Sequence, residues 1–180
     1  MKKIVVFIVS ICFVVSLAAC GATTSEVNKI NPSSAEQKIN SSSVEDTTAS
    51  IGETLDFNGL QITFDSIEKF EDKSGMNKLE DGKMFVMLWF TANNTTGEDQ
   101  YINMFYEDSY CDDTAVDPVS VLFGASGDSL WGDVAAGKKR KGYVAYKVDS
   151  SWSSIEFSYE PELFDKAKMT FKATPDDLSD

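Results

Sequence analysis

From residue 51 onward, apolar side chains recur at every second position, and this period of two constrains the fold more than any other feature. Leu60, Ile62 and Phe64 alternate with polar residues directly after an Asn58-Gly59 pair. Such alternation places successive side chains on opposite faces of a β-strand. Asn-Gly between two alternating runs predicts a hairpin with a type I′ turn. The chain is therefore expected to fold as β-structure.

Further segments carry the same alternation, and no long amphipathic helical pattern accompanies them. Residues 84–92 are apolar on both faces, which predicts a central strand covered on both sides. Past Ser66 the apolar phase shifts by one residue, which predicts a β-bulge. The other predicted elements are strands at 55–57, 60–64, 100–106, 119–123, 143–148, 155–159 and 169–173, with a helical turn at 161–166. About seven or eight short strands between turn residues predict an all-β, antiparallel β-sandwich.

The chain begins with a hydrophobic segment that predicts export. Lys2 and Lys3 precede an unbroken run of apolar or small residues from Ile4 to Leu17. A run of this length is typical of a signal peptide, since a membrane-spanning helix needs about 20 apolar residues. We therefore expect residues 1–19 to be a signal peptide that is removed.

The end of this segment resembles the lipobox of bacterial lipoproteins. Leu17, Ala18, Ala19, Cys20 and Gly21 follow one another in the order of that motif. The resemblance implies recognition by the signal peptidase, diacylglycerol on the Cys20 sulfur and cleavage between Ala19 and Cys20. We expect no cofactor apart from this covalent lipid, and an extracytoplasmic protein anchored to the outer face of the cell membrane. An ordinary secretory signal with a chance cysteine, or an uncleaved anchor, is the alternative.

Composition divides the remaining chain. Residues 20–50 contain the lipidated cysteine and a stretch rich in Ser, Thr and Asn without an aromatic residue, which predicts a disordered tether. As a flexible coil this tether would reach roughly 30 Å. Residues 51–175 hold the aromatic residues of the mature chain and have the size of one domain. Residues 176–180 are expected to form an acidic tail.

Charge, cysteine and histidine content exclude several functions. The formal net charge is −13, which disfavours nucleic acid as a partner. Cys12 leaves with the signal and Cys20 carries lipid, so Cys111 remains as a buried inert thiol or as the link of a disulfide dimer. The chain has no histidine, the commonest general base and metal ligand. Ser66 and Lys69 match the Ser-x-x-Lys nucleophile motif of penicillin-binding enzymes, but the companion motifs of those enzymes are absent. We therefore expect no enzyme and no catalytic residues, and we assign no metal site.

The order of several short motifs resembles a known family. Ile51-Gly52-Glu53-Thr54, the strand 59–64, residues 82–86 running into 91–95, Ala136-Gly137 and residues 142–148 follow one another as in the domain of unknown function 4352. This immunoglobulin-like module is common on lipoproteins of Gram-positive bacteria, and the similarity extends more distantly to secreted immunoprotective mycobacterial antigens. The resemblance covers about residues 50–174 and implies an immunoglobulin-like sandwich with no established activity. The Cys…Trp…Cys core of antibody domains is absent.

Two features are candidates for surface contacts. Lys138, Lys139, Arg140 and Lys141 form the one basic run in an acidic domain, and they are either a charged turn or an electrostatic contact. Trp131 lies among Gly127, Asp128 and Gly132, and Trp152 lies among serines. Such a residue either folds over the end of the sandwich, or anchors a protein partner or stacks on a sugar ring.

These observations lead to a functional expectation without a named activity. We expect a membrane-anchored surface module that binds an unidentified surface protein or wall component. The alternative is a small-ligand or Ca²⁺-binding accessory domain for a membrane partner. Its acidic residues would be Asp108, Asp112, Asp113 and Asp117, followed by Asp128 and Asp133, although their spacing matches no EF-hand and a solvated acidic loop is the simpler interpretation.

Overall fold

The computed structural model describes residues 27–30, 47–72, 75–104, 108–120, 125, 127–161 and 167–179. The predicted lipobox, formed by Leu17, Ala18, Ala19, Cys20 and Gly21, lies outside these residues. So do most of the predicted tether, residues 162–166 of the helical turn predicted at 161–166, and residues 121–123 of one predicted strand. Among the described residues, no helix has the length and apolar character needed to cross a bilayer.

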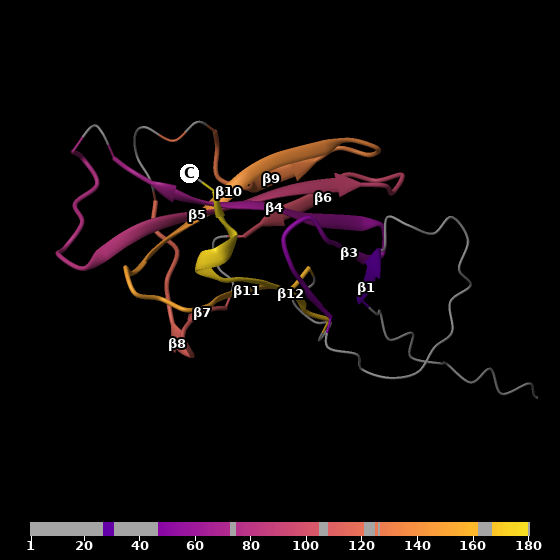
Figure 1. Cartoon of the computed structure of the whole chain (residues 1–180). Coiled ribbons are helices and arrows are strands. Elements are labelled where there is room, and N and C mark those ends of the chain that lie inside the picture. The colour runs from indigo at the N-terminus through magenta and orange to yellow at the C-terminus, as the bar shows by residue number, and fades with distance from the viewer. Residues whose placement is uncertain are drawn as a thin grey trace, which may run out of the picture.

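Two layers of strands form a β-sandwich (Figure 1). The larger sheet has the order β1 (Val27–Ile30), β3 (Thr54–Phe57), β4 (Leu60–Phe70), β5 (Lys83–Asn94) and β10 (Lys139–Asp149), all antiparallel, with β13 (Leu178–Ser179) parallel to β4. The second sheet has the order β2 (Thr48–Ala49), β12 (Met169–Ala173), β11 (Ile155–Tyr159), β7 (Ser109–Cys111) and β8 (Thr114–Ala115). A separate ribbon pairs β6 (Gln100–Asn103) with β9 (Trp131–Val134), and a single 3₁₀ turn, η1, covers Pro175–Asp177. The predicted all-β sandwich is confirmed.

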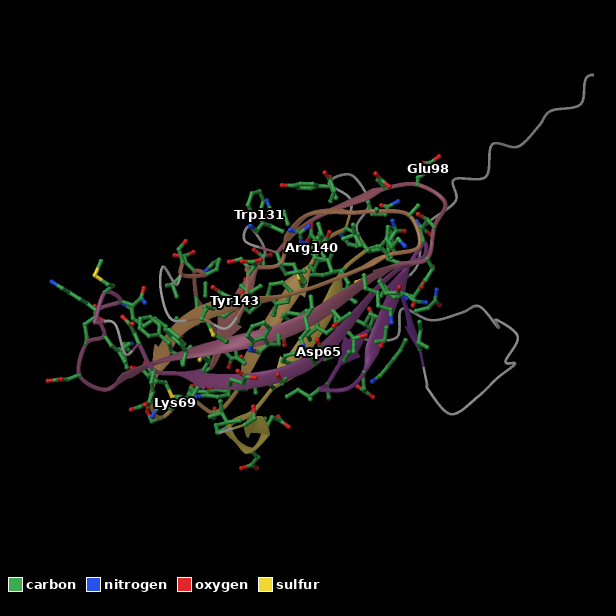
Figure 2. The ribbon with its side chains drawn as sticks, turned by 90° about the horizontal axis from the view of Figure 1, so that it is seen from above. Asp65, Lys69, Glu98, Trp131, Arg140 and Tyr143 are labelled. Atoms are coloured by element: carbon green, nitrogen blue, oxygen red, sulfur yellow. The ribbon has the colours of Figure 1, made fainter. Side chains whose placement is uncertain are left out.

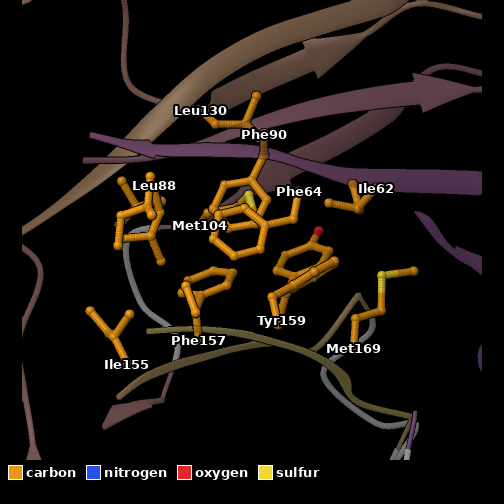
Figure 3. Packing of buried hydrophobic residues seen from close by; sticks show 14 of the residues in the cluster. Ile62, Phe64, Leu88, Phe90, Met104, Leu130, Ile155, Phe157, Tyr159 and Met169 are labelled. Carbon is orange, nitrogen blue, oxygen red and sulfur yellow. The ribbon is translucent and has the colours of Figure 1, made fainter. Parts of the chain in front are cut away.

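Phenylalanine rings fill the space between the two sheets (Figure 3). The Phe90 ring lies 4.9 Å from Phe64 of the same sheet, and 5.2 Å from both Phe157 and Phe171 of the opposite sheet. All four side chains are fully buried. Offset and edge-to-face aromatic pairs add to the stabilisation that burial alone provides. This cluster joins the sheets into one hydrophobic core.

Several local predictions are confirmed. Asn58 and Gly59 have φ angles of 50° and 87°, as a type I′ turn between β3 and β4 requires. The register of β4 against β5 shifts between Phe64 and Ser66, which places the predicted bulge at Asp65. Strand β5 lies between β4 and β10 and is buried on both faces from residue 84 to residue 90. Strands β11 and β12 begin and end at the predicted residues.

The predicted disordered tether is wrong at two places. Residues 27–30 form β1 at the edge of the larger sheet, and residues 48–49 form β2. Val27 packs against the core, while Lys29 Nζ lies 2.6 Å from a Glu53 carboxylate oxygen. The hydrogen bond from Lys29 and another from the Ser50 backbone hold the pKa of Glu53 below its usual value. A free sheet edge can capture a short polar segment through backbone pairing, which composition does not reveal.

Three further predictions need correction. The acidic tail is docked, because Leu178 and Ser179 pair with Ile67 and Glu68 of β4. Residues 119–120 form no strand, although Val119 donates one backbone hydrogen bond to Ala145. The described residues contain thirteen strands in place of the predicted seven or eight, because short edge strands carry too few residues to show a period.

Candidate functional site

The β6–β9 ribbon presents one buried and one exposed row of side chains. Ile102 and Val134 point into the core and are almost fully buried. Tyr101 and Trp131 lie on the opposite face and are 57% and 55% exposed, the two most exposed aromatic side chains of the described residues. We call this solvent-facing row of Tyr101, Asn103, Trp131 and Asp133 the aromatic face.

The strand register sets the pattern of the aromatic face. Tyr101 is paired with Asp133, and Asn103 is paired with Trp131. The two aromatic side chains are therefore diagonal neighbours, a separation of about 7–8 Å that aromatic side chains can bridge. The amide and the carboxylate occupy the other diagonal, so apolar and polar groups alternate in both directions.

Asn94 fixes one end of the ribbon. Its side chain is fully buried at the end of β5. The amide nitrogen donates to the carbonyls of Val134 and Glu98 at 2.8 Å and 2.7 Å, and the amide oxygen accepts from the backbone and hydroxyl of Thr96. Four hydrogen bonds satisfy this buried amide, and they bind β9 to the loop that leads into β6.

Arg140 holds the middle of the ribbon. Its Nη1 donates a 3.0 Å hydrogen bond to the backbone carbonyl of Asp133. Gly132 has a φ of 107°, and a β-carbon at this position would lie 3.3 Å from the Arg140 guanidinium. Figure 2 labels Arg140 and Trp131 at this margin of the large sheet, and Arg140 lies against Gly132 and the Asp133 carbonyl. The positive φ favours glycine at position 132, and the nearby Arg140 side chain would have to shift slightly to admit a β-carbon.

The other end of the ribbon is attached to β10. The Leu130 backbone donates to Tyr143 and accepts from Met104, and the Tyr143 backbone donates to Asp128. The Leu130 side chain is fully buried, while its neighbour Trp131 is exposed. The two tryptophans therefore follow different alternatives. Trp131 faces solvent and is available for contact, whereas Trp152 is buried in the core.

The basic run does not form one surface patch. Strand β10 begins at Lys139, so alternate residues of the run point to opposite faces of the large sheet. Arg140 shares its face with the core residues and extends beneath the ribbon, whereas Lys139 and Lys141 lie on the outer face. Lys141 Nζ lies 3.5 Å from an Asp65 carboxylate oxygen and 5.9 Å from the centre of the Trp89 ring. Lys138 remains exposed in the turn before β10.

The predicted acidic ligands are dispersed. Within the described part of the chain, no group of three Asp, Glu or Cys side chains is arranged to hold a metal ion. Asp112 instead accepts hydrogen bonds from the hydroxyl and backbone of Ser153 and from the backbone of Ser154, which lower its pKa. Asp108 lies 3.4 Å from Lys168, and Asp133 belongs to the aromatic face.

Cys111 is a buried thiol at the end of β7. Burial, and secondarily the nearby Asp112 carboxylate, raise the pKa of this thiol to about 11. The thiolate is the reactive form of cysteine, so the side chain is poorly suited to nucleophilic chemistry near neutral pH.

A cavity of about 520 Å³ lies at the far end of the large sheet, where β4 turns into β5. Phe70, Leu79, Met84 and Phe85 provide its apolar lining, and Lys69 and Asp72 are among its polar residues.

Sequence reasoning identified Trp131 and missed Tyr101 and Asn103. A signal for Tyr101 exists, because Ile102 and Met104 alternate as buried residues and place Tyr101 on the opposite face. Nothing local showed that β6 would pair with β9, because 27 residues (104–130) separate the two strands.

The family model for a domain of unknown function, DUF4352, matches residues 49–169, about two thirds of the chain. None of the curated proteins compared with the chain matches its sequence significantly.

Three solved structures share the fold at low sequence identity. A protein described as a "putative lipoprotein (ycdA)" from Bacillus subtilis has a TM-score of 0.55 and 17% identity over 66% of this chain, and the chain spans 37% of its length. The yjhA protein from Bacillus subtilis has a TM-score of 0.52 and 20% identity, covering 68% of this chain and 97% of that one. A functionally unknown protein from Listeria monocytogenes has a TM-score of 0.50 and 16% identity, covering 67% and 79%. These similarities establish a shared fold.

Proposed function

The chain belongs to the DUF4352 family, and on that premise we propose that it is a membrane-anchored, extracytoplasmic lipoprotein whose β-sandwich binds another surface molecule through its aromatic face. The observation that carries the binding role is the pair of exposed aromatic residues, Tyr101 and Trp131, on a ribbon held at three points. Aromatic side chains of this kind dominate the energy of many interfaces.

The anchor is proposed from the N-terminal sequence. The order Leu17, Ala18, Ala19, Cys20 and Gly21 supports lipid attachment at Cys20, and one protein of similar fold is described as a "putative lipoprotein". Two acyl chains hold a protein to a bilayer far more firmly than one. In a Cys20→Ala variant, we expect lipid labelling to be lost. We also expect the membrane fraction to contain no processed mature form of the protein. Unchanged labelling and membrane retention in this variant would contradict the anchor.

The ribbon is suited to binding because its shape does not depend on a ligand. Asn94, Arg140 and the backbone of Leu130 attach it to the large sheet by hydrogen bonds. An interface that is already ordered loses little conformational entropy on binding. The exposed rings therefore contribute their contact area with a small entropic cost.

Photo-crosslinking in intact cells tests the binding face. A photoreactive phenylalanine analogue would replace Tyr101 or Trp131 in the full-length chain. Tyr110 is the matched control, because it is an aromatic residue of β7 in the second sheet and is 41% exposed. Adducts are expected from positions 101 and 131 and not from 110. Equal adducts at all three positions, or none from the ribbon, would refute this binding face.

A second candidate function is capture of a small molecule in the cavity at the end of the large sheet, where β4 turns into β5. A volume of about 520 Å³ with a mixed apolar and charged lining is in the range of ligand sites. Binding would raise the melting temperature of the mature chain, and replacing Phe85 by a polar residue would abolish this shift. A panel of metabolites and Ca²⁺ that leaves the melting temperature unchanged would remove this candidate.

A further inference from the structure

The aromatic face combines two chemical properties. Tyr101 and Trp131 are more than half exposed, and Asp133, which is paired with Tyr101, adds an exposed carboxylate. Carboxylate oxygens accept hydrogen bonds from hydroxyl and amide groups. A ligand that fits must therefore be apolar on its broad faces and rich in hydroxyl groups at its edges.

A sugar ring in the pyranose form has this amphipathic character. Its axial C–H bonds form an apolar face that packs on an aromatic ring, and its equatorial hydroxyl groups point outward in the ring plane. An equatorially linked polysaccharide is a flat ribbon that presents several such faces in a row. Two aromatic side chains on the diagonal of a β-ribbon can contact successive rings of such a chain.

The charges around the aromatic face favour a neutral ligand. Asp133 lies on the face itself, and the chain carries a formal net charge of −13. Arg140, the only arginine, donates to the Asp133 carbonyl beneath the ribbon, and Lys141 is paired with Asp65 on the outer face of the large sheet. The Arg140 guanidinium therefore offsets the Asp133 charge locally, and the face has no excess positive charge that would attract an anionic polymer.

We infer that the aromatic face binds a neutral, equatorially linked polysaccharide by stacking its pyranose rings on Tyr101 and Trp131. The Asp133 carboxylate accepts hydrogen bonds from the hydroxyl groups or acetamido N–H groups at the edges of the stacked rings. This inference rests on the proposed function, because it names the ligand class of the same face.

Fluorescence titration tests the inference directly. Trp89 and Trp152 are 8% and 4% exposed, so ligand-induced changes in emission report on Trp131. The mature chain carrying Cys20→Ser would be titrated with chito-oligosaccharides and cello-oligosaccharides, whose chains are flat. Malto-oligosaccharides, whose chains coil, are the shape control, and polyglycerol phosphate is the charge control.

Saturable binding to a flat neutral oligosaccharide is expected, with little dependence on salt. Tyr101→Ala and Trp131→Ala should each weaken it by about tenfold or more, as for the central residues of an interface. Trp131→Phe should retain part of the affinity, because it keeps an aromatic face. Tyr110→Ala should leave the affinity unchanged.

The remaining outcomes separate the inference from the proposed function. A protein adduct at positions 101 and 131 in cells, without binding to any flat oligosaccharide, would refute the polysaccharide and leave the binding face standing. Salt-sensitive binding to polyglycerol phosphate alone would also overturn the inference. Oligosaccharide binding that persists in the double variant Tyr101→Ala/Trp131→Ala would place the sugar elsewhere and refute it. Absence of both sugar binding and adducts would refute the two proposals together.

Discussion

The core between the sheets and the β6–β9 ribbon use aromatic residues in opposite ways. Phe90 is fully buried and has three phenylalanine rings within 5.2 Å. Tyr101 and Trp131 are more than half exposed, on a face that also carries Asn103 and Asp133. Burial makes the first group essential for folding, whereas the second group leaves most of its apolar surface in water. The number of aromatic residues therefore says little about what each one does. The role of each ring depends on whether it contacts other side chains or solvent.

The two regions also differ in how they are held. The core depends on apolar burial shared among many side chains. The ribbon is attached to the sheet through specific polar contacts of Asn94 and Arg140. Loss of a core ring should weaken the whole domain, while loss of a ribbon contact should act mainly on the position of the aromatic face.

The largest effect is expected from Phe90→Ala. Removing this ring leaves a cavity between the sheets and should lower the free energy of unfolding by about 3–5 kcal/mol. Urea denaturation of the mature chain measures the change. A loss below about 1 kcal/mol would show that the core is not organised around this ring.

Gly132→Ala tests how the ribbon is held. The left-handed φ and the nearby Arg140 guanidinium should together cost about 1–3 kcal/mol of unfolding free energy. Gly97→Ala is the matched control, because Gly97 has open space around it and no positive φ. Equal stability of both variants would mean that Arg140 and Gly132 do not constrain the ribbon.

A smaller, pH-dependent effect is expected from Asp112→Asn at the start of the turn between β7 and β8. Because hydrogen bonds from Ser153 and Ser154 lower the folded-state pKa of Asp112, its ionised form stabilises the fold above the unfolded-state pKa. This contribution is lost as the pH falls through the lowered folded-state pKa. Wild type should therefore melt at a higher temperature than the variant near pH 7, and the two should converge in acid. A constant difference down to the acid limit would contradict the assignment.

The smallest effect on stability is expected from Tyr101→Ala and Trp131→Ala. Exposed positions usually change the free energy of unfolding by no more than about 0.5 kcal/mol. Binding through the aromatic face should nevertheless weaken by about tenfold or more. If either variant destabilised the fold as much as Phe90→Ala, the contrast between core and ribbon would fail, and the exposed rings would be structural.

Local interactions explain which parts of the fold were predictable. The Asn58-Gly59 turn, the bulge near Ser66 and strands β11 and β12 were identified because alternation and turn chemistry act between near neighbours. Strands β1 and β13 were missed, since they are too short to show a period and lie in polar stretches of the chain, and they form by pairing with strands of the larger sheet.

The candidate site was predictable only in part. Trp131 and the basic run stood out by composition, but the sequence did not show that Arg140 would point beneath the ribbon while Lys139 and Lys141 point to the other face. That arrangement depends on where β10 begins. The strand starts at Lys139, four residues before the predicted start at Tyr143, so it contains the whole basic run except Lys138.

The sequence by itself determined the class of fold, the predicted address at the membrane and the absence of histidine chemistry, because these follow from periodicity, from one short motif and from composition. Only the tertiary structure decided that Tyr101 and Trp131 share a face, that Asn94 and Arg140 hold the ribbon from below, and that Trp152 is buried. These contacts join residues far apart in the chain. They depend on how strands pair and layers pack, and no local pattern of residues encodes that pairing.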